Sequence, residues 1–253
     1  MINKKEIKAK LLSAKRRLTQ GFQAIFQPSK LYIYPRFEYS YHCLSFSQEG
    51  EDKVLWKLLG GKNLKEKGFY VDIGAHHPQK LSNTYFFYLR GWKGINIDPI
   101  PDGITRFKKL RNRDTNLEIA IFENTDKLTY YIYNQQALNT FSKNLVEQRK
   151  KESINPIRQK EIKTDTLAEV LDKYLPKDQE IDFINIDVEG LDHAVLKSND
   201  WQKYRPSLIV IETLATDSLL KALNSSVCLF LKKQGYGLIS KTHNSLFFKE
   251  GIG

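Results

Sequence analysis

The chain has 253 residues, of which 27% are charged and 41% apolar, and its formal net charge is +11. This composition excludes a disordered chain, a collagen-like repeat and a coiled coil, and the length predicts one large domain or one domain with an appendage. No apolar run approaches the roughly 18 residues of a membrane-spanning helix. Two cysteines and an N-terminus without the apolar core of a signal peptide indicate a reducing, cytoplasmic location.

The excess positive charge is concentrated at the N-terminus. Residues 1–20 contain seven Lys or Arg and one acid, which gives +6 and leaves +5 for the other 233 residues. Residues 4–26 have apolar side chains at helical spacing, which predicts a basic amphipathic helix. Such a helix can pack on the domain, lie on the inner surface of an anionic membrane, or form an oligomer contact such as that of a dimer. With an aromatic connector it forms a predicted N-terminal part of residues 1–44.

The remaining residues, 45–253, alternate short apolar runs with helical segments. Strands are predicted over 68–73, 94–98, 117–122, 182–187 and 207–212, with helices over 47–59, 81–90, 102–111 and 166–176. This alternation is typical of parallel β–α units in a doubly wound α/β sheet. Two further strands, 236–240 and 245–249, are predicted to form a C-terminal hairpin. The segment 123–163, with one edge strand over 128–133 and a polar stretch after it, is predicted to be an insertion.

Candidate ligand-binding residues follow the first two strands. Ligands of an open parallel sheet bind at the carboxyl ends of its strands. Gly74 after the first strand permits a tight turn, and Asp98 after the second can accept hydrogen bonds from ribose hydroxyls. The glycine pattern of dinucleotide-binding proteins and the P-loop are both absent, which disfavours a pyrophosphate cradle.

The motifs at these strand ends resemble one known family. The run FYVDIGAHHP, followed by SNT, GWKGINIDP and FINIDVEGLDHAVL, is similar to the FkbM-type methyltransferases that use S-adenosylmethionine. The stretch SFSQEGED before the first strand is similar too, and the resemblance spans residues 45–250. It implies a Rossmann-like class I methyltransferase fold: a seven-stranded, mostly parallel sheet with an antiparallel C-terminal hairpin. It also implies O-methylation, commonly of sugar hydroxyls.

The resemblance implies roles for individual residues. Asp187 is the first candidate for the general base or a metal ligand, with Glu212 as the second ligand of a magnesium ion. Glu189 belongs to the same block, and His77 and His243 are alternative bases. The residues expected to bind the cofactor are Gln48, Asp72, Gly74, Ala75, His76, Ser82, Asn83, Thr84, Asp98 and Glu118.

The predicted reaction is methyl transfer from S-adenosylmethionine to a hydroxyl of a sugar, glycan or glycolipid precursor. The basic run Arg149-Lys150-Lys151 could guide an anionic or lipid-linked acceptor. Two alternatives stay open: an NAD-dependent oxidoreductase and a non-catalytic, membrane-associated scaffold with a vestigial pocket. Nucleic acid fits poorly, because the sequence has no recognised binding module and no stripe of basic residues interleaved with aromatic ones.

Overall fold

The computed structural model describes residues 43–100, 103–135, 138–213 and 218–252. The chain divides into two compact units, Met1–Ser45 and Phe46–Gly253, and the described helices and strands belong to the second. The predicted amphipathic helix over residues 4–26 lies outside the described residues.

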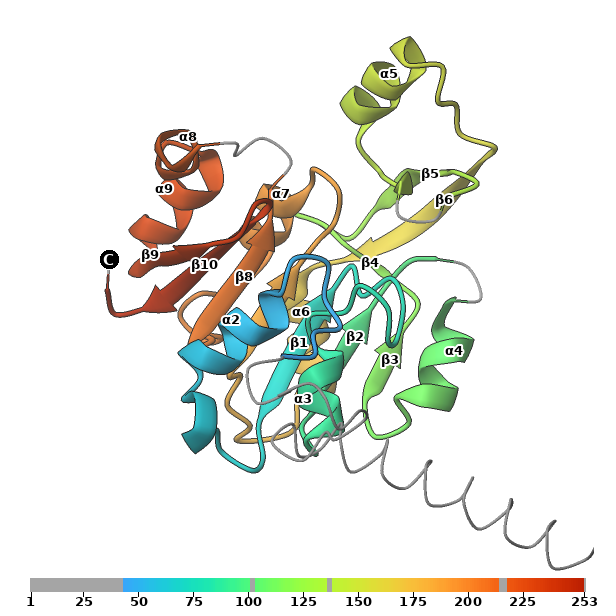
Figure 1. Ribbon diagram of the computed structural model, residues 1–253. Coiled ribbons are helices and arrows are strands. Elements are labelled where there is room, and N and C mark those ends of the chain that lie inside the picture. The colour runs from blue at the N-terminus through green and yellow to red at the C-terminus, as the bar shows by residue number, and fades with distance from the viewer. Residues whose placement is uncertain (1–42, 101–102, 136–137, 214–217, 253) are drawn as a thin grey trace, which may run out of the picture. The chain divides into compact units, whose positions relative to one another are not determined.

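A seven-stranded mixed sheet forms the centre of this unit, in the order β3-β2-β1-β7-β8-β10-β9 (Figure 1). Neighbouring strands from β3 to β8 are parallel, whereas β10 is antiparallel to both β8 and β9. The strands are β1 (Phe69–Ile73), β2 (Lys93–Ile97), β3 (Thr115–Leu117), β7 (Phe183–Ile186), β8 (Leu208–Glu212), β9 (Tyr236–Lys241) and β10 (Ser245–Glu250). This topology confirms the predicted doubly wound sheet with its C-terminal hairpin.

Helices cover both faces of the sheet because its central strands are apolar on both sides. Every residue of β1 and β7 is buried. The largest core cluster joins the sheet to α6, α7 and α9, and a second cluster joins it to α2 and α3. The helices are α2 (Glu51–Leu58), α3 (Tyr85–Leu89), α4 (Gly103–Leu110), α5 (Lys143–Lys151), α6 (Leu167–Tyr174), α7 (Asp192–Lys197), α8 (Leu219–Leu223) and α9 (Ser226–Lys233), with a 3₁₀ turn, η3 (Gly61–Asn63).

The strand register places the candidate site. The chain leaves β1 toward β2 and β3, and then returns to the other side of β1 to form β7, so the strand order switches between β1 and β7. Ile73 at the end of β1 pairs with Ile97 on one side and with Ile186 on the other. The residues that follow these three strands therefore meet at one edge of the sheet, where a crevice is expected.

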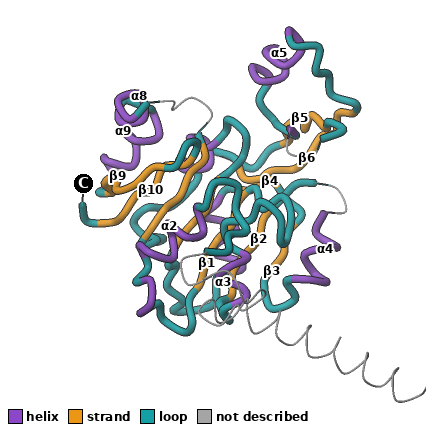
Figure 2. Tube along the Cα trace, in the orientation of Figure 1, coloured by secondary structure: helices purple, strands orange, loops and turns teal. Residues whose placement is uncertain are grey.

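The prediction of a single strand over 117–122 is wrong. Its first part belongs to β3 in the large sheet, and its second part, β4 (Ala120–Ile121), pairs with β6 (Arg158–Asp165) in a separate three-stranded sheet, β4-β6-β5. The strand predicted over 128–133 is present as β5 (Lys127–Ile132) and pairs antiparallel with β6. Figure 2 shows β5, β6 and α5 together. They form most of the insertion, for which only one strand was predicted.

Two predicted helices are shorter than expected because polar side chains bond locally before them. Before α2, Ser47 and Asp52 exchange hydrogen bonds, and the helix begins only at Glu51. Before α3, the hydroxyl of Ser82 accepts the backbone N–H of Tyr85. The capping box predicted at Thr166 is present and begins α6. Within the described ranges, none of the helices combines the length and the apolar character needed to cross a bilayer.

Candidate active site

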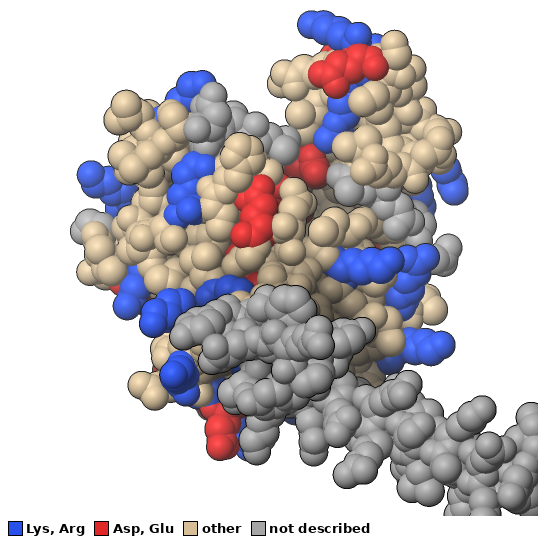
Figure 3. Space-filling model, in the orientation of Figure 1, with Lys and Arg blue, Asp and Glu red and all other residues tan. Residues whose placement is uncertain are grey.

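A cavity of about 440 Å³ opens at the carboxyl ends of β1, β2, β7 and β8. Its walls are completed by residues 48–51 before and at the start of α2, by the β9–β10 turn and by the insertion. The volume lies in the range that binds a cofactor-sized ligand. Figure 3 shows acidic side chains at the middle of the face of the molecule that it views.

Six carboxyl groups line this cavity, whereas Arg149 supplies the one guanidinium among the described lining residues. The acids are Glu49, Glu51, Asp98, Asp187, Glu189 and Glu212. The hydroxyls of Thr242 and Ser245 donate to Glu51, and the backbone N–H of Asn244 donates to Glu49. These bonds hold the start of α2 against the C-terminal hairpin at the edge of the cavity.

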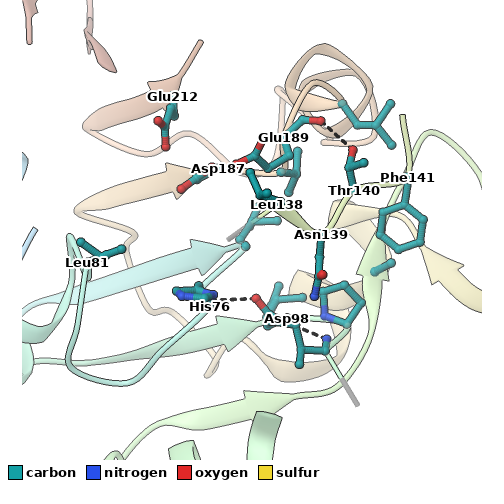
Figure 4. Close-up of a pocket in the computed structure, with 18 of the residues that line it drawn as sticks. His76, Leu81, Asp98, Leu138, Asn139, Thr140, Phe141, Asp187, Glu189 and Glu212 are labelled. Carbon is teal, nitrogen blue, oxygen red and sulfur yellow. Dashed lines mark hydrogen bonds between the residues drawn. The ribbon is translucent and has the colours of Figure 1, made fainter. Parts of the chain in front are cut away.

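Asp98 is fixed at the end of β2 by two backbone donors (Figure 4). Its carboxylate accepts the N–H of His76 at 2.7 Å and that of Ile100 at 2.8 Å. Only 6% of the residue is exposed, and this burial raises the pKa of Asp98 from 3.8 to about 6. A carboxylate has about four lone-pair directions, so two acceptor sites remain for hydroxyl groups of a ligand.

Gly74 makes the tight turn that sequence reasoning expected. Its φ is +82°, and its N–H donates to the carbonyl of Ile97 at 2.9 Å. A Cβ on this residue would stand 1.7 Å from the carbonyl oxygen of Asp187, so only glycine fits. The turn after β1 and the turn after β7 therefore touch through backbone atoms alone.

Asp187 and Glu212 form a carboxyl pair over the middle of the sheet. Asp187 follows β7, and Glu212 is the last residue of β8. Both line the cavity, and Figure 4 shows them on the same side of it. Burial, and next the charge of Glu212, raise the pKa of Asp187 far above its ordinary value. Among the described residues, neither acid is part of a salt bridge, so no ion pair offsets the burial that raises the pKa of Asp187.

Glu189 is fastened to the insertion. Arg149 donates to its carboxylate at 2.9 Å, and the hydroxyl of Thr140 donates to its carbonyl at 3.0 Å. Burial raises the pKa of Glu189, and Arg149 opposes that effect. The residue has a φ of +53° and lines the cavity. The pair therefore joins the turn after β7 to α5.

Asp72 lies beneath the cavity instead of lining it. Its carboxylate accepts the Thr84 hydroxyl at 2.5 Å and the Asn185 amide at 2.8 Å, and the Asn185 carbonyl oxygen accepts the Asn83 amide at 2.8 Å. Fully buried Arg111 also donates to Thr84. This network holds Asn83 at the cavity wall, and burial raises the pKa of Asp72. Asp72 and Thr84 thus act as positioning residues.

The structure places other predicted residues away from the cavity lining. His77 turns its Nδ1 toward its own loop, where it accepts the backbone N–H groups of Gln79 and Lys80. His243 occupies the β9–β10 turn, where its carbonyl accepts the Lys241 ammonium. Among the predicted residues, the ones that do line the cavity are Gln48, Gly74, His76, Asn83, Asp98, Asp187, Glu189 and Glu212, whereas Asp72, Ala75, His77, Ser82, Thr84, Glu118 and His243 do not.

Magnesium binds through oxygen ligands in a near-octahedral arrangement. In the described part of the chain no three His, Cys, Asp or Glu side chains are grouped so as to hold a metal ion. Asp187 and Glu212 can supply two oxygen ligands, so any further ligands would have to be water or substrate oxygens. The predicted magnesium ion therefore stays a hypothesis for experiment.

The insertion contributes lining residues that sequence reasoning missed. They are Tyr130, Gln135, Leu138, Asn139, Thr140 and Phe141, with Arg149, which had been considered only as a guide for an anionic acceptor. They approach the cavity because β4 pairs with β6 and because Tyr131 and Thr140 form an isolated bridge. Nothing in the hydrophobic pattern of this polar segment marks them as part of a site.

Comparison with known proteins identifies a family and similar folds. Residues 72–238 match the family model of the methyltransferase FkbM domain. Among solved structures, the chain is similar to a precorrin-6y C5,15-methyltransferase from Geobacter metallireducens, with 12% identity, a TM-score of 0.36, and coverage of 78% of this chain and 84% of that one. It is also similar to an O-methyltransferase from Bacillus cereus in complex with SAH, with 12% identity, a TM-score of 0.32, and coverage of 90% and 88%. The comparison with curated proteins gave no match.

The strand order, the glycine turn after β1 and the acid after β2 define a class I methyltransferase domain. The family model covers about two thirds of the sequence, and the chain therefore belongs to the FkbM family of S-adenosylmethionine-dependent methyltransferases. This confirms the resemblance seen in the sequence, and it favours a methyltransferase over an oxidoreductase or a scaffold. The residues present fit the cofactor, because Asp98 in the cavity wall keeps acceptor sites for ribose hydroxyls and the Gly74 turn after β1 lines the same cavity.

Proposed function

We propose that this methyltransferase transfers a methyl group to a hydroxyl oxygen of a sugar unit in a glycan or glycolipid precursor. The observation that carries the proposal is the Asp187–Glu212 pair, which is half-buried, lacks a salt bridge within the described chain, and lines the cavity. A sugar hydroxyl is weakly acidic, so its reaction needs a group that removes the proton. A carboxyl pair that lines the cavity supports this role, because it can take up the proton.

When bound, S-adenosylmethionine supplies an electrophilic methyl group with a neutral thioether as leaving group. Asp187 would take the proton of the acceptor hydroxyl, so that its oxygen could receive the methyl group. Glu212 beside it stabilises the protonated state through the contact that raises the pKa of Asp187. Asp98 and the Gly74 turn hold the nucleoside end, so that the acceptor has to be aligned only at the other end of the cavity.

The charge of the lining favours a neutral acceptor over an anionic one. Among the described lining residues, six carboxyls face one guanidinium, and that guanidinium already pairs with Glu189. Lys150, from the same basic run, pairs with Glu147 on the surface of α5. A uronic acid or phosphate entering the cavity would meet like charge, whereas the hydroxyls of a neutral sugar can donate to these acids.

The experiment is methyl transfer measured by mass spectrometry on a panel of neutral and uronic-acid oligosaccharides, with wild type and Asp187→Asn. We expect the substitution to lower turnover by at least ~100-fold, the range of a lost general base, and to change the affinity for S-adenosylhomocysteine less than about threefold, within the noise of an unperturbed site. Asp182→Asn is the control, because Asp182 is a buried carboxylate that accepts the N–H of Phe69 outside the cavity.

Near-normal turnover of Asp187→Asn would remove the base assignment. Methylation of uronic-acid substrates alone would contradict the neutral acceptor. Activity that is lost with a chelator and restored by magnesium would assign the carboxyl pair to a metal ion, and activity insensitive to chelator would discard that hypothesis.

A further inference from the structure

Asn139 in the insertion presents an unused hydrogen-bond donor to the cavity. The residue lines the cavity but is only 7% exposed, and its side-chain nitrogen Nδ2 has no partner among the described residues. The neighbouring backbone is held in place, since Tyr131 and Thr140 exchange N–H···O bonds of 2.9 and 3.2 Å. A buried amide nitrogen without a partner costs free energy unless a ligand supplies an acceptor.

The orientation of this amide follows from its other end. The backbone N–H of Tyr133 donates to Oδ1 of Asn139 at 2.8 Å. Turning the amide over would set its NH₂ group against this N–H, so that two donors would face each other. Nδ2 must therefore be the end left free, and the cavity receives a donor at this point.

Asn139 lies on the cofactor side of the cavity. Figure 4 shows its amide end pointing toward Asp98, and both residues line the cavity. Tyr130, in β5 of the insertion, lines the same cavity, and burial and next the charge of Asp98 raise the pKa of its hydroxyl. The Asn139 side chain lowers this pKa, but its Nδ2 and the Tyr130 hydroxyl do not form a hydrogen bond.

We propose that Asn139 donates a hydrogen bond to the oxygen of a ribose hydroxyl of the cofactor, and that the same hydroxyl donates a hydrogen bond to Asp98. A hydroxyl oxygen can donate and accept at once, and here an acceptor and an unpaired donor converge on one place. This inference rests on the proposed function, because it takes S-adenosylmethionine as the ligand. It assigns to the insertion a role in binding the cofactor, and makes Asn139 a cofactor-binding residue that no sequence motif marks.

The test is the affinity for S-adenosylhomocysteine, measured by titration calorimetry on the full chain. Asn139→Asp keeps an oxygen for Tyr133 and removes the donor, whereas Asn139→Leu has similar volume and removes both groups. We expect both variants to bind at least tenfold more weakly. Asn199→Asp is the matched control: Asn199 is also buried and also has one unpaired side-chain atom, but it lies outside the cavity lining, and its variant should bind within twofold of wild type.

Analogues of S-adenosylhomocysteine that lack the 2′- or the 3′-hydroxyl locate the contact. For one of them, the difference between wild type and Asn139→Leu should shrink to less than twofold, because the acceptor is already gone. If both Asn139 variants bind S-adenosylhomocysteine like wild type, or if the tenfold loss persists with both analogues, the proposal is overturned. Wild type that does not bind S-adenosylhomocysteine at all would instead refute the proposed function. Thermal unfolding of each variant shows that it is folded, and Asn139→Asp carries the test if the leucine variant is not.

Discussion

The buried carboxylate of Asp98 predicts a dependence of cofactor binding on pH. The group has a pKa of about 6, and it must be ionised to accept hydrogen bonds from both ribose hydroxyls and backbone donors. At pH 7 about nine tenths of the protein carries the ionised form, and at pH 5 only about one tenth does. Because apparent affinity is reduced by the fraction of the competent form, binding of S-adenosylhomocysteine should weaken about tenfold between pH 7 and pH 5.

The same pKa makes a prediction for stability. Since the pKa in the folded protein is above its value of 3.8 in a model peptide, the folded state binds the proton more tightly than the unfolded chain. The ionised carboxylate therefore costs the folded protein about 3 kcal/mol above pH 6, and this cost disappears as the pH falls through 6 to below 4. The cofactor hydroxyls stabilise the ionised form and should offset part of the cost.

The assay is calorimetric titration of S-adenosylhomocysteine at half-unit steps from pH 5 to pH 8, with Asp98→Asn as the comparison. The variant cannot ionise at this position, so it should bind weakly at every pH and lose the tenfold dependence. Circular dichroism at each pH shows that the protein stays folded. Wild-type affinity that is flat over this range, or an equal dependence in the variant, would refute the reasoning.

Two further substitutions probe the contacts that hold the site together. Gly74→Ala should abolish measurable binding of S-adenosylhomocysteine and lower the thermal midpoint of unfolding, because its Cβ would overlap the Asp187 carbonyl. Gly251→Ala is the control. Gly251 has a φ of +75° and open space around it, so this variant measures the effect of backbone strain alone and should bind normally. A double-mutant cycle with Arg149→Met and Glu189→Gln, followed by urea unfolding, should give a coupling free energy of about 1–2 kcal/mol for this half-buried pair. If the changes in the free energy of unfolding for the two single variants simply add in the double variant, the pair does not fasten the insertion.

The large sheet could be predicted because its strands carry their own signal. The runs that form β1, β7 and β8 are mostly apolar; Gly74 follows the first, Asp187 follows the second, and Glu212 ends the third. Their burial and the position of the site at their carboxyl ends therefore follow from local sequence. The motif around Asp187 indicated the FkbM family, and the match to the family model confirmed it.

The insertion could not be predicted because its structure depends on distant partners. β6 has the sequence RQKEIKTD, in which one residue of eight is buried, and α5 buries only Val146. Neither shows the apolar spacing on which strands and helices are recognised. Both exist because β6 pairs with β4 and β5, and because Arg149 and Thr140 bind the turn at Glu189. The lining residues of this segment were missed for the same reason.

The contact between Gly74 and the carbonyl of Asp187 limits how this enzyme can change during evolution. With no side chain between the two turns, neither can shift without moving the other, so a mutation that reshapes the acceptor end of β7 will also disturb the grip on the nucleoside. Acceptor preference is more easily altered from outside the sheet. Most lining residues of the insertion lie between β5 and α5, so those other than Asn139 can be exchanged while the pair of turns is inherited unchanged.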